Sequence, residues 1–218
     1  SQKNFAVSPD NPTPAVITIT TDNTTTPPST TTKFTGGIEV VVTATVGDRN
    51  NQLLTDAHTI FFKTEFGVIE PSCVTEEGKC SVTWTSNKPP DDDWIENDGL
   101  VTIMAYTTGE ETFSDVNGNN LYDDIDEATL GGDSYEDLDE PYVDANENAI
   151  HDTGEEIVDT INGNDSQGNN GVHDFPDTFY NGPACTHSSL CSAVVKNPVI
   201  WDSFHLDIVT RTTASAAR

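Results

Sequence analysis

The most constraining feature of this chain is a long acidic stretch without a single cationic side chain. Between Lys88 and Lys196 there is no Lys or Arg, whereas the same interval carries 26 Asp and Glu residues. The chain of 218 residues has a formal net charge of −28. Self-repulsion on that scale destabilises a compact state unless counter-ions are bound. The stretch is therefore either a disordered acidic tract or an element that folds around cations.

Oxygen-bearing side chains recur on alternate residues within this stretch. The phrase DVNGNNLYD begins at Asp115, and the phrase DANENAIHD begins at Asp144. In a twelve-residue calcium loop the ligands come from positions 1, 3, 5, 7, 9 and 12, because alternate spacing lets one turning backbone direct successive oxygens inward. Two closely matched phrases favour calcium loops over a disordered tail or a solvated acidic surface.

Each phrase supplies a full set of predicted ligands, with a backbone carbonyl at the seventh position. The first set is Asp115, Asn117, Asn119, Leu121, Asp123 and Asp126, with Glu127 adjacent. The second set is Asp144, Asn146, Asn148, Ile150, Asp152 and Glu155. The sixth position, usually Gly, is Asn120 or Ala149. Because Ala tolerates the left-handed region poorly, we expect the second loop to turn differently from an EF-hand.

A third, degenerate unit follows the second. Its segment from Asn170 through Val172 to Asp174 matches the second phrase from Asn148 onward. That alignment puts Ser166 and Gly168 at the first two positions. Alternatively, Asp165 is the first ligand with one extra residue, or Asp159, Asn162 and Asn164 form or share another site.

A longer repeat connects these units. Glu111, Glu140 and Glu155 each stand four residues before an Asp, namely Asp115, Asp144 and Asp159. Glu155 thus both closes the second unit and opens the next one. Because Glu111 and Glu140 hold the same place in the repeat, they are added to the predicted ligands. We expect two or more calcium ions, strung along a ladder of turns. His151 and His173 hold corresponding positions, which favours a structural role beside the ions.

Four cysteines form two close pairs, Cys73 with Cys80 and Cys185 with Cys191. Neither pair has the C-x-x-C spacing of a zinc or redox site. We predict two local disulfides, the first joining cross-strand partners of a hairpin, and hence export through an oxidising compartment. The rival interpretation is four buried free thiols in a cytosolic protein.

Strand-forming residues dominate outside the acidic stretch. Predicted strands are 15–20, 38–46, 59–62, 66–69, 79–85, 100–106 and 199–209, the last in two parts. These short β-branched segments, punctuated by Gly, Pro and Asn, indicate an all-β chain forming an antiparallel β-sandwich.

The strands suggest four parts of the chain. An N-terminal arm (1–14) precedes the first six strands (15–108), and the last strand lies within 198–218. Between the last two strands lies an acidic, loop-rich calcium-binding insertion (109–197). A structureless loop of that length is improbable. Because the insertion offers little hydrophobic core, we expect ions to order it. The Pro-containing arm is expected to be free to pair with a neighbour's sheet edge.

Residues 15–107 resemble bacterial group 1 Ig-like domains of the invasin and intimin class. The resemblance is carried by ITITTDN from Ile17, VVVTATV from Val40, GVIE from Gly67 and GKCSVTWTS from Gly78. The acidic segment 111–174 is similar to dockerin and thrombospondin type 3 calcium repeats, whose EF-hand-like loops lack regular helices. The resemblance implies an Ig-like sandwich in an extracellular or bacterial cell-surface protein, acting as a stalk, adhesin or filament subunit.

Several other functions are disfavoured. The net charge argues against nucleic acid, whose phosphates need Lys and Arg, and no apolar run of 18 residues could span a membrane. No hydrolase, metalloprotease or phosphate-binding motif occurs, so we expect no enzyme. Expected partners are copies of the chain or other surface proteins, met through sheet edges, with glycans as the alternative. Trp84 and Trp201 are expected in the core, and Trp94 is the better candidate for a sugar contact.

Overall fold

The computed structural model describes residues 11–13, 17–21, 37–87, 100–125, 131–161 and 168–207. Within these ranges the chain contains strands, bridges and turns but no helix, and all strand pairs are antiparallel. The predicted all-β class is confirmed at this level. Each of the seven predicted strand segments contains a strand. Sequence reasoning missed β5, which has only three residues.

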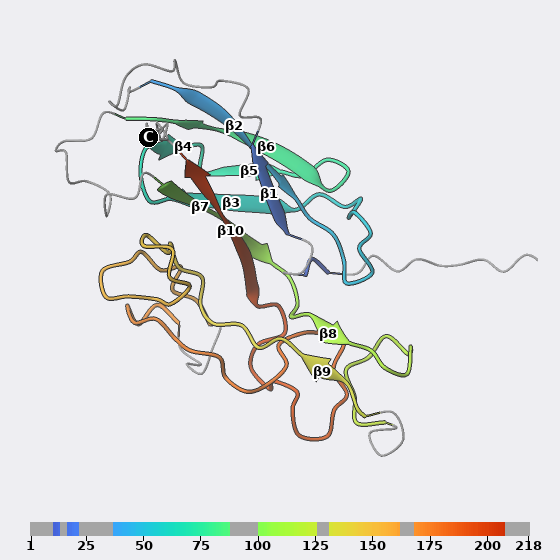
Figure 1. Cartoon of the computed structure of the whole chain (residues 1–218). Helices are drawn as coiled ribbons and strands as arrows, with labels where there is room; N and C mark the ends of the chain where they lie inside the picture. The colour runs from blue at the N-terminus through green and yellow to red at the C-terminus, as the bar shows by residue number, and fades with distance from the viewer. Residues whose placement is uncertain are drawn as a thin grey trace, which may run out of the picture.

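The two main sheets have four strands each and face one another (Figure 1). The first sheet has the order β1-β2-β6-β4, with the bounds Thr18–Thr21, Glu39–Thr45, Lys79–Thr85 and Val68–Ile69. The second has the order β10-β7-β3-β5, with the bounds Val199–Asp207, Leu100–Thr108, Thr59–Thr64 and Ser72–Val74.

Alternating strands bury one face of each sheet in a shared apolar core. In β2 the buried residues Val40, Val42 and Ala44 alternate with exposed or half-buried ones. Trp84 is 1% exposed at the centre, and its indole N–H donates to the Phe66 carbonyl at 2.8 Å. The prediction that Trp84 belongs to the core is confirmed.

The first disulfide joins the two sheets. Cys73 and Cys80 are bonded as predicted, with their Cα atoms 5.9 Å apart. They are not partners in one hairpin, however, because β5 pairs with β3 and β6 pairs with β2 and β4. The turn between them, bridged at Glu76 and Lys79, carries the chain from one layer to the other. The hairpin prediction was therefore wrong, and the bond cross-links the layers of the sandwich.

A second body of the protein lies between β7 and β10 in the sequence. The two strands pair along their whole length, from Val199 opposite Thr108 to Asp207 opposite Leu100. The chain between them forms loops below the sandwich in Figure 1, with a small sheet of β8 (Phe113–Ser114) and β9 (Ser134–Tyr135). We call this part, residues 109–198, the loop layer.

The loop layer packs on the outer face of β7. Thr102 and Met104, which point away from the sandwich core, are nevertheless fully buried. The Thr102 hydroxyl donates to the Asp144 carbonyl at 2.6 Å. β7 is consequently buried on both faces over much of its length, which explains why its sequence has no charged side chain.

The sandwich also supplies cations to the loop layer, whose own sequence has a single one, Lys196. Arg49 lies 3.5 Å from Glu110, donates to the Asn120 carbonyl at 3.2 Å and stands over the Phe113 ring at 4.6 Å. Lys63 pairs with Glu156. Part of the charge of the acidic stretch is thus balanced across the boundary between the two bodies.

The loop layer has an apolar centre that sequence reasoning missed. Phe113, Tyr122 and Tyr180 are buried together, and the second predicted disulfide, Cys185–Cys191, packs against them. Tyr122 and Tyr180 have ring centroids 4.9 Å apart. The core of the loop layer is thus small, and the sequence did not reveal it because these aromatic residues are scattered along the chain and gather only in the fold.

The N-terminal arm is not free where the structure describes it. Thr13 is fully buried and donates its N–H to the Gly47 carbonyl at 3.2 Å. The Pro12 carbonyl accepts the Glu110 N–H at 2.9 Å. Residues 11–13 are therefore hydrogen-bonded to both the sandwich and the loop layer, which contradicts the free-arm prediction for these residues. Residues 1–10 and 14 lie outside the described ranges.

The inter-sheet disulfide gives the first testable prediction. Replacing both Cys73 and Cys80 with Ser should lower the free energy of unfolding by about 2–3 kcal/mol, because the bond closes a short loop in the unfolded chain. Urea unfolding followed by Trp fluorescence measures the change. Replacing Cys185 and Cys191 instead is the matched control. Loss of the first bond without effect on sandwich stability would contradict the inter-sheet role.

Candidate metal centre

The first predicted loop turns around its opening carboxylate. The two oxygens of Asp115 accept N–H groups from the turn, including Gly118 at 2.6 Å and Asn120 at 2.7 Å. Asn119 accepts the Leu121 N–H at 2.8 Å, and its amide approaches Asp123 at 2.7 Å. The side chains predicted as ligands from positions 1, 5 and 9 are therefore close together.

The second loop repeats this arrangement at the corresponding residues. Asp144 accepts the Ala149 N–H at 2.7 Å, as Asp115 accepts that of Asn120. Asn148 accepts the Ile150 N–H at 2.8 Å, and the amides of Asn146 and Asn148 both donate to Asp152. Those two hydrogen bonds lower the pKa of Asp152.

Both loops share one unusual backbone conformation. The sixth residue is left-handed in each, with φ of 64° at Asn120 and 60° at Ala149. The fourth residue is also left-handed, at Gly118 and Glu147. The second loop thus turns as the first does, although its sixth residue is Ala. The hydrogen bond to the first carboxylate holds Ala149 in a conformation that costs a non-Gly residue about 1–2 kcal/mol.

The third loop begins at Asp159, one of the alternatives left open by the sequence. Asp159 accepts the Gly171 N–H, and Asn170 accepts the Val172 N–H at 2.6 Å. Gly171 is left-handed with φ of 77°, as the sixth residue is in the other loops. Asn162, Asn164, Asp165 and Ser166, which the alternatives also named, lie outside the described residues. The third loop is thus opened by Asp159 and resumes its pattern at Asn170.

Each loop is closed by a carboxylate that accepts two backbone N–H groups, those of the second and ninth residues. Glu155 accepts them from Ala145 and Asp152, both at 2.8 Å. In the third loop Glu140 accepts them from Thr160 at 2.6 Å and Asp174 at 3.1 Å. This two-point contact is the common closing feature of the loops, and we call it the carboxylate clasp.

Asp133 makes the clasp of the first loop, and sequence reasoning missed it. Asp133 accepts the N–H groups of Val116 at 2.9 Å and Asp123 at 3.1 Å. Asp126 and Glu127, the predicted closing residues, lie outside the described ranges. A signal was present in the sequence, since Gly132-Asp133-Ser-Tyr135 parallels Gly154-Glu155-Glu-Ile157.

The second and third loops pack against each other through their aromatic residues. His151 and His173 stack with centroids 4.3 Å apart, and Tyr142 meets both rings edge-on. Tyr142 also bridges Ile157 in antiparallel fashion. The two histidines therefore do have a packing role, as their matched positions predicted.

The donor set of these loops suits a hard divalent cation. Carboxylates, Asn amides and backbone carbonyls are the ligands that calcium takes. Asp159 Oδ1 is buried without a hydrogen-bond partner, so the third loop has an oxygen to offer. Among the described residues, however, no three His, Cys, Asp or Glu side chains form a group that could hold a metal by themselves. Ion binding therefore requires the Asn amides to turn their oxygens inward.

Burial makes Glu140 and Glu111 costly to ionise. Glu140 and Glu111 are 0% and 1% exposed. Burial raises the pKa of Glu140, and it raises that of Glu111 to about 8. The backbone N–H groups that these carboxylates accept oppose both shifts. Glu111 accepts those of Leu138 at 3.0 Å and Asn181 at 2.7 Å. A bound cation would favour the ionised forms further.

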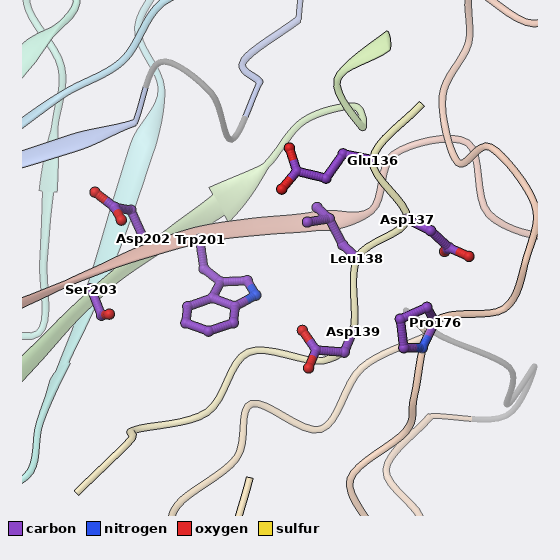
Figure 2. A pocket seen from close by; sticks show the side chains of 8 residues that line it. All are labelled: Glu136, Asp137, Leu138, Asp139, Pro176, Trp201, Asp202 and Ser203. Atoms are coloured by element: carbon purple, nitrogen blue, oxygen red, sulfur yellow. The ribbon is translucent and has the colours of Figure 1, made fainter. Parts of the chain in front are cut away.

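A separate pocket of about 520 Å³ lies where β10 meets the loop layer. Figure 2 shows the Trp201 ring in its middle, with Leu138 and Asp139 on one side and Asp202 and Ser203 on the other. Trp201 is half-buried here, so the prediction that it belongs to the core was wrong. Its indole N–H is buried without a partner. Trp94 lies outside the described residues.

Comparisons of the chain with protein-family models, curated proteins and solved structures found no significant match. In the described part of the chain, no helix has the length and apolar character to cross a membrane. Both disulfides fit an oxidising compartment.

The strained residue of the second loop gives a second prediction. Ala149→Gly should raise the free energy of unfolding by about 1 kcal/mol, because Gly adopts positive φ without steric cost. Thermal unfolding with calcium present measures it. Ala145→Gly in the same loop is the matched control and should be neutral or destabilising. Equal effects of the two substitutions would contradict the left-handed assignment.

Proposed function

We propose that this chain is an extracellular, calcium-stabilised structural protein in which calcium ions order the loop layer of an Ig-like sandwich. One observation carries the proposal. Three loops of different sequence and length share the same opening Asp, left-handed sixth residue and carboxylate clasp. A solvated acidic surface has no reason to repeat such an arrangement, whereas an opening Asp, alternate oxygen-bearing residues and a sharp turn at the sixth residue are features of a calcium loop.

Calcium has a physical task in this fold. The loop layer buries Glu140, Asp123 and other carboxylates, and a buried carboxylate is costly unless it is paired. Its apolar centre is small, so repulsion among the carboxylates opposes folding. Each bound ion neutralises that repulsion and links turns that are distant in sequence.

The role that follows is mechanical and non-enzymatic, as a surface stalk, adhesin or filament subunit. Its support is the resemblance of residues 15–107 to Ig-like modules, together with two disulfides. The strands β4 and β5 end their sheets, and Val68 and Val74 on them are 56% and 61% exposed. Exposed apolar edge strands suit pairing with another chain, so assembly through these edges is part of the proposal.

Calcium removal tests the proposal directly. In calcium the protein should melt at a higher temperature and resist protease within residues 109–198, whereas chelation should remove both effects. One site adds about 2.7 kcal/mol when free calcium is 100 times its dissociation constant. Calorimetry and limited proteolysis measure this, and the Asp152→Ala variant should show a smaller gain. Identical melting and cleavage with and without calcium would contradict the proposal.

A carbohydrate-binding module is the second candidate, favoured by the pocket at Trp201. An aromatic face, an unpartnered indole N–H and the carboxylates of Asp139 and Asp202 are groups that can contact a sugar. If this function holds, a glycan array should show a specific ligand that Trp201→Ala loses, while the variant keeps its calcium-dependent melting. Absence of any glycan signal from the calcium-loaded protein would leave the structural role alone.

A further inference from the structure

A fourth set of residues in the loop layer shows the same arrangement, although its parts are far apart in sequence. Asp137 accepts the Thr178 N–H at 2.7 Å, as the opening Asp does in each loop. Asp177 accepts the Phe179 N–H at 2.8 Å, which is the role of the fifth residue. Thr178, at the sixth position, is left-handed with φ of 67°. The fourth loop therefore opens at Asp137 and resumes at Asp177.

Glu111 makes the clasp of this fourth loop. Its two oxygens accept the N–H groups of Leu138 and Asn181, which are the second and ninth residues of the set. In the other loops, the N–H groups of the same two positions are accepted by Asp133, Glu155 and Glu140. Glu111 therefore makes its hydrogen bonds to the fourth loop, which begins 26 residues after it, and not to the first loop.

A buried oxygen without a partner points to a ligand here. Asn181 is 1% exposed, and its Oδ1 has no hydrogen-bond partner. Its Nδ2 lies 3.3 Å from three oxygens, which belong to Glu111, Asp177 and the Phe179 carbonyl. Asp137 Oδ1 is likewise buried without a partner. Oxygens from three residues thus converge on the Asn181 amide, and two more oxygens, Asn181 Oδ1 and Asp137 Oδ1, have no hydrogen to accept.

We propose that this convergence is a fourth divalent-cation site, of the calcium class. Its ligands are the side chains of Asp137, Asp177, Asn181 and Glu111 and the carbonyl of Phe179. Binding turns the Asn181 amide so that its oxygen joins the others, which removes the unpartnered acceptor. It also draws the three carboxylates together, because in the described structure they do not by themselves form a group that could hold a metal. The proposal rests on the proposed calcium role, and it adds a site that no contiguous stretch of sequence encodes.

The fourth site completes a pairing of loops. Tyr122 and Tyr180 stand at the eighth positions of the first and fourth loops and lie together, as His151 and His173 do in the second and third. Phe113 pairs with Tyr135 in the small sheet, as Tyr142 bridges Ile157.

Clasps are exchanged within each pair. The carboxylate that stands four residues before one loop makes the clasp of the other loop in the pair. Glu111 and Asp133 do so in the pair of the first and fourth loops, and Glu140 and Glu155 do so in the pair of the second and third loops. Each ion therefore holds both loops of its pair, and the loop layer should take up four ions.

Native mass spectrometry of the calcium-loaded chain tests the fourth site. The full chain should bind four ions, and Asp137→Ala and Asp177→Ala should each lose at least one. Asp177→Asn should keep four, because Asn holds the fifth position in the other three loops. Asp139→Ala removes a neighbouring carboxylate outside the set and is the control that should also keep four.

The outcomes separate the two proposals. A chain that binds three ions, with no loss in Asp137→Ala or Asp177→Ala, overturns the fourth site and leaves the calcium role intact. A chain that binds none overturns both. If Asp177→Ala does not fold, Asp137→Asn takes its place and should likewise lose an ion. This substitution keeps the size and the acceptor oxygen of Asp137 and removes its charge.

Discussion

The loop layer depends on one contact, the carboxylate clasp. In it, a carboxylate that precedes one loop accepts two backbone N–H groups of the loop paired with it. Glu140 and Glu155 make this contact across the second pair of loops, at distances of 2.6–3.1 Å. The clasp satisfies N–H groups that the open loops leave without partners. It also places carboxylates inside the protein, where, under the proposed function, a bound calcium ion would stabilise their ionised forms. On that proposal, the same side chains serve both the backbone N–H groups and the ions.

The sandwich gives this layer a rigid support and positive charge, of which the layer's own sequence has only that of Lys196. Arg49 and Lys63 reach acidic residues across the boundary, and Thr102 holds the second loop to β7. Since β7 and β10 pair along their full length, both ends of the loop layer are fixed in adjacent strands. Ordering a long segment between fixed ends costs less entropy than ordering a free tail.

The sequence predicted the strands and two loops well because both follow local patterns. β-branched runs such as Val40 to Thr45 form strands, and the D-x-N-x-N spacing by itself brings oxygens together. What it missed depends on contacts between distant residues. Asp133 and Asp137 are separated from the loops that they serve, and the aromatic centre gathers residues from Phe113 to Tyr180. Trp201 was expected in the core because its strand was identified, but strand alternation puts Ile200 in the sandwich core and turns Trp201 to the opposite face, toward the loop layer.

Hydrogen exchange followed by mass spectrometry tests most directly whether calcium and the clasps order the loop layer. The account predicts that peptides from residues 109–198 exchange slowly in calcium and within seconds in chelator, while peptides from β2 and β6 stay protected in both. The clasped amides of Ala145, Asp152, Thr160 and Asp174 should show the largest change. Equal protection of the loop layer in calcium and in chelator would contradict the account, because the layer would then be ordered without ions.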